Sequence, residues 1–146
     1  MKLYLMRHGQ AASFEVDPEQ GLSNEGKAAI EQLAHKLAKQ DVTFKQVFHS
    51  EKARAQQTAE IMASILAPDV FPSSRENLKP NDDPELLLAD IYTWQENTLI
   101  ASHLPFIPHL LMLLTGNNQP GNFVPGTIAC LTKNDSKWQL EWISRP

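Results

Sequence analysis

Short apolar runs alternate with helix-forming segments along this chain of 146 residues, and this alternation constrains its fold more than any other feature. The apolar runs typical of buried strands span residues 2–6, 46–50 and 97–102. The helix-forming segments follow Ser23 and span residues 52–66, 84–95 and 106–116. The alternation predicts an α/β protein, with one three-layer domain, a mostly parallel sheet and helices on both faces.

Capping and turn residues support several of these boundaries. Ser23 can cap the first helix, and Asp83 with Pro84 can open the third by a cap and a first-turn proline. Two further apolar runs, at 126–132 and 138–144, are separated by turn-forming residues. This arrangement predicts a hairpin of two final strands.

Two segments carry neither pattern. Residues 11–22 are polar and contain Pro18 and Gly21, so we expect a loop there. Three prolines between residues 68 and 80 predict a second irregular stretch. Both are expected to lie outside the regular elements.

Composition limits the classes of partner. The formal net charge is -4 and lysine and arginine form no long run, which disfavours nonspecific binding to nucleic acid or to anionic membranes. The single cysteine, Cys130, lies in an apolar run and is expected to be a small core residue. The apolar start is too short for a signal peptide, and no segment approaches a membrane span. We therefore expect a cytoplasmic monomer.

Basic and polar residues follow three of the predicted strands. The run 7–9 (Arg-His-Gly) follows the first strand, and 49–50 (His-Ser) ends the second, with Arg54 one turn into the next helix. The pair 102–103 (Ser-His) follows the third. Because parallel strands present their carboxyl ends at one edge of the sheet, these side chains are predicted to form one site.

The chemistry of these residue types suits a phosphoryl group. Arg7 and Arg54 each offer a planar fork that matches phosphate oxygens. A neutral His8 can attack phosphorus with its lone pair, and nearby arginines disfavour its protonation. His103 and the arginines can stabilise charge during transfer, and Gly9 is expected to let the ligand approach the backbone.

Three motifs carry a family resemblance. They are "LMRHGQ" at 5–10, "HSEKARAQQTAEI" at 49–61 and "ASHLP" at 101–105. Together they resemble the histidine phosphatase superfamily, which has the phosphoglycerate-mutase-like fold. In motif order and chain length the sequence looks most like the SixA-type phosphohistidine phosphatase branch. The resemblance covers almost the whole chain and implies one histidine phosphatase domain over residues 1–146.

The resemblance also implies roles for individual residues. His8 is implied to be the nucleophile that becomes phosphorylated, and Arg7, Arg54 and His103 are implied to bind the phosphoryl group. No metal or other cofactor is implied. The substrate is expected to be a phosphorylated histidine-phosphotransfer domain of a two-component signalling system.

The sequence departs from the family pattern in two places. Gln20 stands where relatives often carry an arginine, and its role stays open. Many relatives have an acidic proton donor in the middle third, where Asp82, Asp83 or Glu85 could serve here, and Asp17 is another candidate. For Asp83, a helix cap is the favoured interpretation. When a phosphohistidine is hydrolysed, the leaving group is an imidazole, which needs less help from an acid than a leaving alkoxide does.

Other interpretations remain open at this stage. A small-metabolite phosphomonoesterase of the same superfamily is the main alternative, although a short chain favours a site open to a protein substrate. A metal-binding module could use His8, His49 and His103, but two arginines would repel a cation. A catalytically silent phosphate-binding protein is disfavoured by the complete set of site residues. His49 either lines the pocket or only ends a strand.

Overall fold

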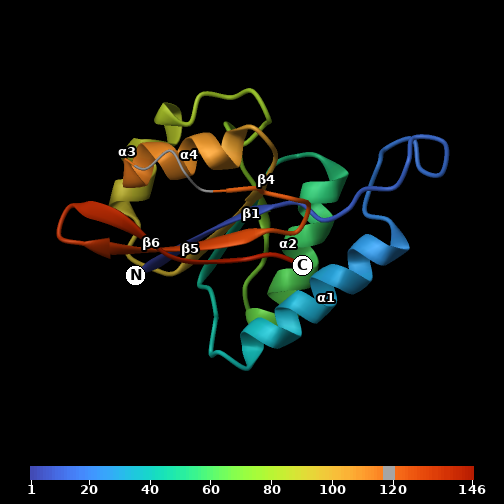
Figure 1. Ribbon diagram of the computed structural model, residues 1–146, viewed down its shortest axis with the longest axis horizontal. Helices are drawn as coiled ribbons and strands as arrows, with labels where there is room; N and C mark the ends of the chain where they lie inside the picture. The colour runs from blue at the N-terminus through green and yellow to red at the C-terminus, as the bar shows by residue number, and fades with distance from the viewer. Residues whose placement is uncertain (117–120) are drawn as a thin grey trace.

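A single six-stranded sheet organises the computed structural model, which describes residues 1–116 and 121–146 (Figure 1). The strand order is β3-β2-β4-β1-β5-β6. The strands are β1 (Lys2–Arg7), β2 (Gln46–His49), β3 (Ser73–Ser74), β4 (Thr98–Ser102), β5 (Ile128–Asn134) and β6 (Lys137–Ser144). The helices are α1 (Asn24–Ala38), α2 (Ala53–Leu66), α3 (Glu85–Thr93) and α4 (Phe106–Thr115). The β3, β2, β4 and β1 strands run parallel, and β5 and β6 complete the sheet as an antiparallel hairpin.

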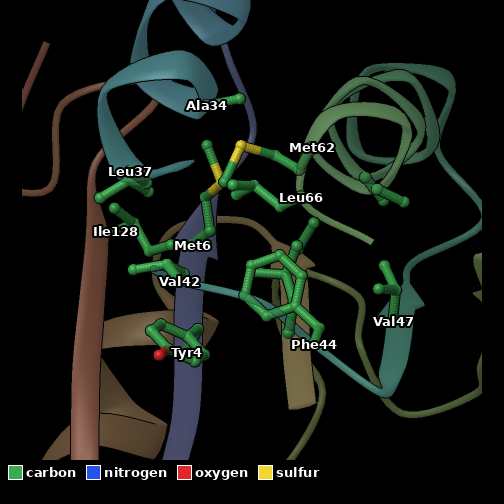
Figure 2. Close-up of a cluster of buried hydrophobic side chains, with 14 of the residues drawn as sticks. Tyr4, Met6, Ala34, Leu37, Val42, Phe44, Val47, Met62, Leu66 and Ile128 are labelled. Atoms are coloured by element: carbon green, nitrogen blue, oxygen red, sulfur yellow. The ribbon is translucent and has the colours of Figure 1, made fainter. Parts of the chain in front are cut away.

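The alternation of side chains along β1 builds two cores, one on each face of the sheet. Tyr4 and Met6 belong to the core under α1 and α2, where Figure 2 shows them beside Leu37, Met62 and Phe44. The intervening side chains of β1 are those of leucines that face the core under α3 and α4. The expected three-layer α/β architecture is confirmed.

The register of the parallel strands aligns their carboxyl ends. Arg7 at the end of β1 pairs with Ser102 at the end of β4, and His49 at the end of β2 pairs with Ala101. The loop after β1 projects beyond this edge in Figure 1, near the start of α2. The segments that follow the three strands therefore begin side by side.

Several predicted boundaries need correction. The third helix ends at Thr93 rather than at residue 95, because Trp94 leaves the helical conformation. Between the prolines, Ser73–Ser74 pairs with β2 as a short edge strand, where the sequence analysis expected only irregular chain. The hairpin turn is tighter than expected because β5 continues to Asn134. Gly116 ends α4 in a left-handed conformation.

Candidate active site

His8 and His103 meet at the carboxyl edge of the sheet. The His8 amide donates to the carbonyl oxygen of Ser102 at 2.9 Å, which ties the segment after β1 to the end of β4. The two imidazole rings are 5.1 Å apart between centroids. His8 is 8% exposed and His103 is 2% exposed, so both rings are largely shielded from water.

Hydrogen bonding defines the tautomer of His8. Its Nδ1 lies 2.7 Å from the carbonyl oxygen of Gly9. Because a carbonyl oxygen only accepts, Nδ1 carries the hydrogen and Nε2 keeps a lone pair. The pKa of His8 is lowered to about 4, mainly by burial and in smaller part by the positive charges of Arg54 and Arg7, against the opposing effect of the Gly9 carbonyl. The ring is thus neutral at neutral pH, with burial rather than the arginines as the main cause.

Arg7 and Arg54 act on each other as well as on the histidines. The Nη1 of Arg7 donates to the carbonyl oxygen of Phe123 at 2.8 Å, while its Nε is buried without a hydrogen-bond partner. Burial and the charge of Arg54 lower the pKa of Arg7. Arg54 lies in the first turn of α2 and is half-buried. Two guanidinium groups that repel each other in this way favour an anionic ligand between them.

Thr58 connects the two segments that carry the arginines. Its hydroxyl donates to the carbonyl oxygen of Arg54 at 2.7 Å and accepts from the amide of Gly9 at 3.0 Å. Packing gives a second reason for glycine at position 9, beside the expected approach of a ligand, which stays a prediction. A Cβ there would lie 2.9 Å from Ile30 and 3.2 Å from Leu22, so the missing side chain admits α1 and the core.

His103 is held by a serine to which the sequence analysis gave no role. The Oγ of Ser50 lies 2.6 Å from Nε2 of His103, and both residues are buried. Burial lowers the pKa of His103 to about 3, and the charges of His8, Arg54, Lys52 and Arg7 act in the same direction. Ser50 follows the end of β2 directly, and this position is the sequence signal that placed it among the site side chains without a role of its own.

The structure places the candidate proton donors in other hydrogen bonds. Asp17 accepts from the amides of Glu19 and Gly21 and so organises the loop after β1. Asp83 accepts from the amide of Glu85 at 3.0 Å, as a residue that caps α3. Asp82 accepts from the amide of Lys79 at 2.9 Å.

Gln20 and His49 are equally engaged in local structure. Gln20 adopts a left-handed conformation and donates from its side chain to the carbonyl oxygen of Ala12 at 3.4 Å. His49 ends β2, is buried and places its Nδ1 2.8 Å from the carbonyl oxygen of Ser50. Within the described ranges, no three histidine, cysteine or acidic side chains are grouped so that they could hold a metal ion.

A polar cleft lies at the segment that directly follows Ser50. It has a volume of about 260 Å³ and is lined by Glu51, Ser74, Arg75, Glu76, Asn77, Lys79 and Asp82. Glu51 follows Ser50 directly, and the neighbouring Leu78 accepts a hydrogen bond from the hydroxyl of Ser102 at 2.5 Å. His8 and His103 are not among the residues that line this cleft, and none of its carboxylates shifts the pKa of either ring.

Among the helices of the described residues, none has the length and apolar character needed to cross a lipid bilayer.

The fold and the site define an α/β protein with two buried, neutral histidines at the carboxyl edge of its sheet, close to cationic side chains. The family model of the histidine phosphatase superfamily (branch 1) matches residues 3–79. The chain is 30% identical to phosphohistidine phosphatase SixA of Escherichia coli (strain K12), over 96% of this chain and 93% of that protein. This chain belongs to the histidine phosphatase superfamily, whose enzymes use a histidine nucleophile.

Solved structures agree with this assignment. The protein histidine phosphatase SixA complexed with tungstate superposes with a TM-score of 0.86 at 27% identity, covering 98% of this chain and 96% of that one. The α-ribazole phosphatase from Shigella flexneri gives a TM-score of 0.75 at 20% identity, with 97% and 95% covered. The second likeness concerns the fold alone. The predicted family and the phosphoglycerate-mutase-like fold are confirmed.

Proposed function

We propose that this chain is a phosphohistidine phosphatase that removes phosphate from a histidine-phosphotransfer domain. The observation that carries the proposal is the neutral His8, which keeps a lone pair on Nε2 and for which the only charges that shift its pKa are those of cations. The full-length similarity to a phosphohistidine phosphatase supports the same substrate class. We also propose that residues 1–146 act as one domain, since β1 and β6 share one sheet.

The proposed reaction has two steps. In the first, Nε2 of His8 attacks phosphorus as the P–N bond to the substrate imidazole breaks, and the departing imidazole nitrogen takes a proton from water. In the second, water attacks the phosphoryl group on His8, which releases inorganic phosphate and restores the neutral ring. Arg7, Arg54 and His103 bind the phosphoryl oxygens in both steps.

Positive charge in the proposed site comes from the chain itself. Arg7 and Arg54 supply the charge that magnesium ions bring to many other phosphoryl-transfer sites. We therefore expect activity to survive exhaustive chelation. Loss of activity on chelation, with recovery when a divalent cation is added, would contradict this part of the proposal.

Competing substrates provide the test. We would compare kcat/KM for a phosphorylated histidine-phosphotransfer domain with the values for several sugar phosphates and phosphoglycerate. The expected result is a preference for the protein substrate. A tenfold preference for any small metabolite, about 1.4 kcal/mol of transition-state stabilisation, would overturn it.

One feature favours a second candidate, a small-metabolite phosphomonoesterase. The polar cleft beside the site brings Glu51, Glu76 and Asp82 together with Lys79, so a small phosphate ester could find both polar contacts and an acid there. Such an ester leaves as an alkoxide and needs a proton from the enzyme. The same comparison of kcat/KM separates the two candidates.

A further inference from the structure

Among the described residues, Ser50 makes the only side-chain hydrogen bond to an imidazole nitrogen of His103. The Oγ of Ser50 is 2.6 Å from Nε2 of His103, a short distance for a hydrogen bond between a hydroxyl and a ring nitrogen. Ser50 is 1% exposed, so water does not compete for its hydroxyl. Its backbone amide donates to the carbonyl oxygen of Ala101 at 3.3 Å, which anchors the serine to β4.

The direction of this hydrogen bond determines which nitrogen of His103 carries the hydrogen. The amide of Lys52 donates to Oγ of Ser50 at 3.3 Å, which occupies a lone pair of that oxygen. Among the described residues, Nε2 of His103 is the only acceptor that contacts Oγ of Ser50, so we take the hydroxyl as the donor in this hydrogen bond. A neutral imidazole has one donor and one acceptor nitrogen, so this arrangement leaves the hydrogen of His103 on Nδ1.

The surroundings of Nδ1 favour the same tautomer. Nδ1 of His103 is buried and has no hydrogen-bond partner in the protein. The positive charges of Arg7, Arg54 and Lys52 act on this ring, so the pocket attracts anions. A bare lone pair on Nδ1 would repel an anionic oxygen, whereas an N–H group would donate to it.

We propose that Ser50 is a positioning residue that fixes His103 as the Nδ1–H tautomer, so that Nδ1 donates to an oxygen of the bound phosphoryl group. The inference rests on the proposed function only in the identity of the ligand, because its test uses inorganic phosphate. The pKa of His103, lowered to about 3, is consistent with it, since a neutral ring needs a partner that selects one tautomer. Ser50 thus acts through His103 and does not itself bind the ligand.

The first test is nitrogen-15 NMR of the histidine rings in the wild-type protein without phosphate. We expect the resonances of His103 to show hydrogen on Nδ1 and an acceptor nitrogen at Nε2. Hydrogen on Nε2 would overturn the proposal without any variant. Because no substrate is used, this result does not depend on whether the chain hydrolyses phosphohistidine.

The second test uses variants and phosphate affinity. Ser50→Ala should give a mixture of His103 tautomers and about tenfold weaker binding of inorganic phosphate, which corresponds to about 1.4 kcal/mol. Ser50→Thr, which keeps a hydroxyl, should show the single His103 tautomer and the phosphate affinity of the wild type. The matched control is Thr98→Val, which removes a buried hydroxyl at the opposite end of β4 that donates to the carbonyl oxygen of Glu96 at 2.9 Å.

The control variant and the wild-type NMR measurement separate a positioning role of Ser50 from a simple loss of stability. Thr98→Val should leave the His103 tautomer and phosphate affinity unchanged. If Ser50→Ala keeps the wild-type tautomer and affinity, Ser50 only packs beside the ring and the proposal is wrong. If Ser50→Ala does not fold, the wild-type NMR result and the Ser50→Thr variant still decide it.

Discussion

The imidazole ring of His8 lies 5.1 Å from that of His103 at an interplanar angle of 58°, although the two residues follow different strands. Both rings are buried, and both have lowered pKa values. The positive charges of Arg7 and Arg54 lower the pKa of both rings, and Lys52 and His8 lower that of His103 as well. An anion bound here would offset this repulsion and raise the pKa values of both rings.

Replacing His8 with alanine should abolish turnover and leave the fold intact, because the variant lacks the nitrogen that attacks phosphorus. Wild-type enzyme quenched during turnover with a labelled substrate should carry label that is lost in acid, as a phosphoramidate is. The control is His35→Ala, which changes an exposed histidine on α1 and should keep full activity. Label that survives acid but is lost in base would place the phosphoryl group on a carboxylate instead.

Stability should depend on pH through the two buried histidines. Their pKa values, about 4 for His8 and about 3 for His103, lie below the ordinary value of about 6.5 that the unfolded chain has. Between these values the unfolded chain binds more protons, so the free energy of unfolding rises with pH by about 1.4 kcal/mol per unit for each histidine. The contribution is fully present above about pH 6.5 and is lost as the pH falls toward the folded pKa values.

Urea denaturation in phosphate-free buffer at several pH values between about 4 and 7 measures this slope. The His8→Gln variant should lose about one histidine's share of it, while His35→Ala should keep the wild-type slope. An unchanged slope in His8→Gln would show that the His8 pKa is not lowered in the folded protein.

Arg54→Ala should weaken the binding of vanadate or phosphate by about 2–5 kcal/mol, because it removes one charged partner of a buried anion. The phosphate affinity of Arg54→Lys should lie between those of the wild type and Arg54→Ala, since lysine keeps the charge but lacks the planar fork of arginine. Calorimetric titration measures the affinities, and Lys36→Ala, an exposed change in the last turn of α1, serves as the control. If Arg54→Ala binds phosphate like the wild type, Arg54 does not reach the ligand.

The sequence could predict which side chains meet in the candidate site, because these residues lie at the ends of predicted parallel strands. Arg7, His8 and His103 follow short apolar runs, and parallel strands align such positions regardless of the side chains around them. The β3 strand could not be predicted, since the two residues Ser73–Ser74 show no periodicity and pair only because β2 lies beside them.

Individual contacts between segments that are distant in the chain could not be predicted from the sequence either. The sequence places Ser50 and His103 at neighbouring strand ends but does not indicate that their side chains share a hydrogen bond. Nothing in the local sequence indicates that Thr58 accepts from the amide of Gly9, since that contact depends on the packing of α2 against the sheet edge. The close approach of α1 at Gly9 and Gly26 likewise arises from tertiary packing. The roles of the site residues in catalysis remain predictions that the variants test.

Gly26→Ala should destabilise the protein by about 1–3 kcal/mol or more, because a Cβ there would lie 2.2 Å from the carbonyl oxygen of Gln10 and the backbone would have to move. Gln10 lies two residues after His8 in the loop that follows β1, so a shift of its backbone should lower phosphate affinity as well. Gly116→Ala offers a comparison, as its Cβ would meet open space and only the left-handed φ of 71° would cost about 1–2 kcal/mol. A Gly26→Ala variant as stable as the wild type in urea would contradict the packing argument.

Replacing the candidate acids should matter little for a phosphohistidine substrate. Asp17 and Asp83 are engaged with backbone amides, and Asp82 accepts from the amide of Lys79 in the cleft. None of these carboxylates is among the charged groups that shift the pKa of His8. Because the leaving imidazole can take its proton from water, proton donation by a carboxylate is not required.

We therefore expect Asp82→Asn and Asp83→Asn to keep kcat/KM for a phosphorylated histidine-phosphotransfer domain within about tenfold of the wild type, or about 1.4 kcal/mol. Glu60→Gln, an exposed change on α2, is the matched control for loss of a carboxylate. An alkyl phosphate should respond more strongly to Asp82→Asn, because an alkoxide needs a proton as it leaves. A loss beyond tenfold with the phosphohistidine substrate would show that this site does use a carboxylic acid, and the leaving-group argument would then be wrong.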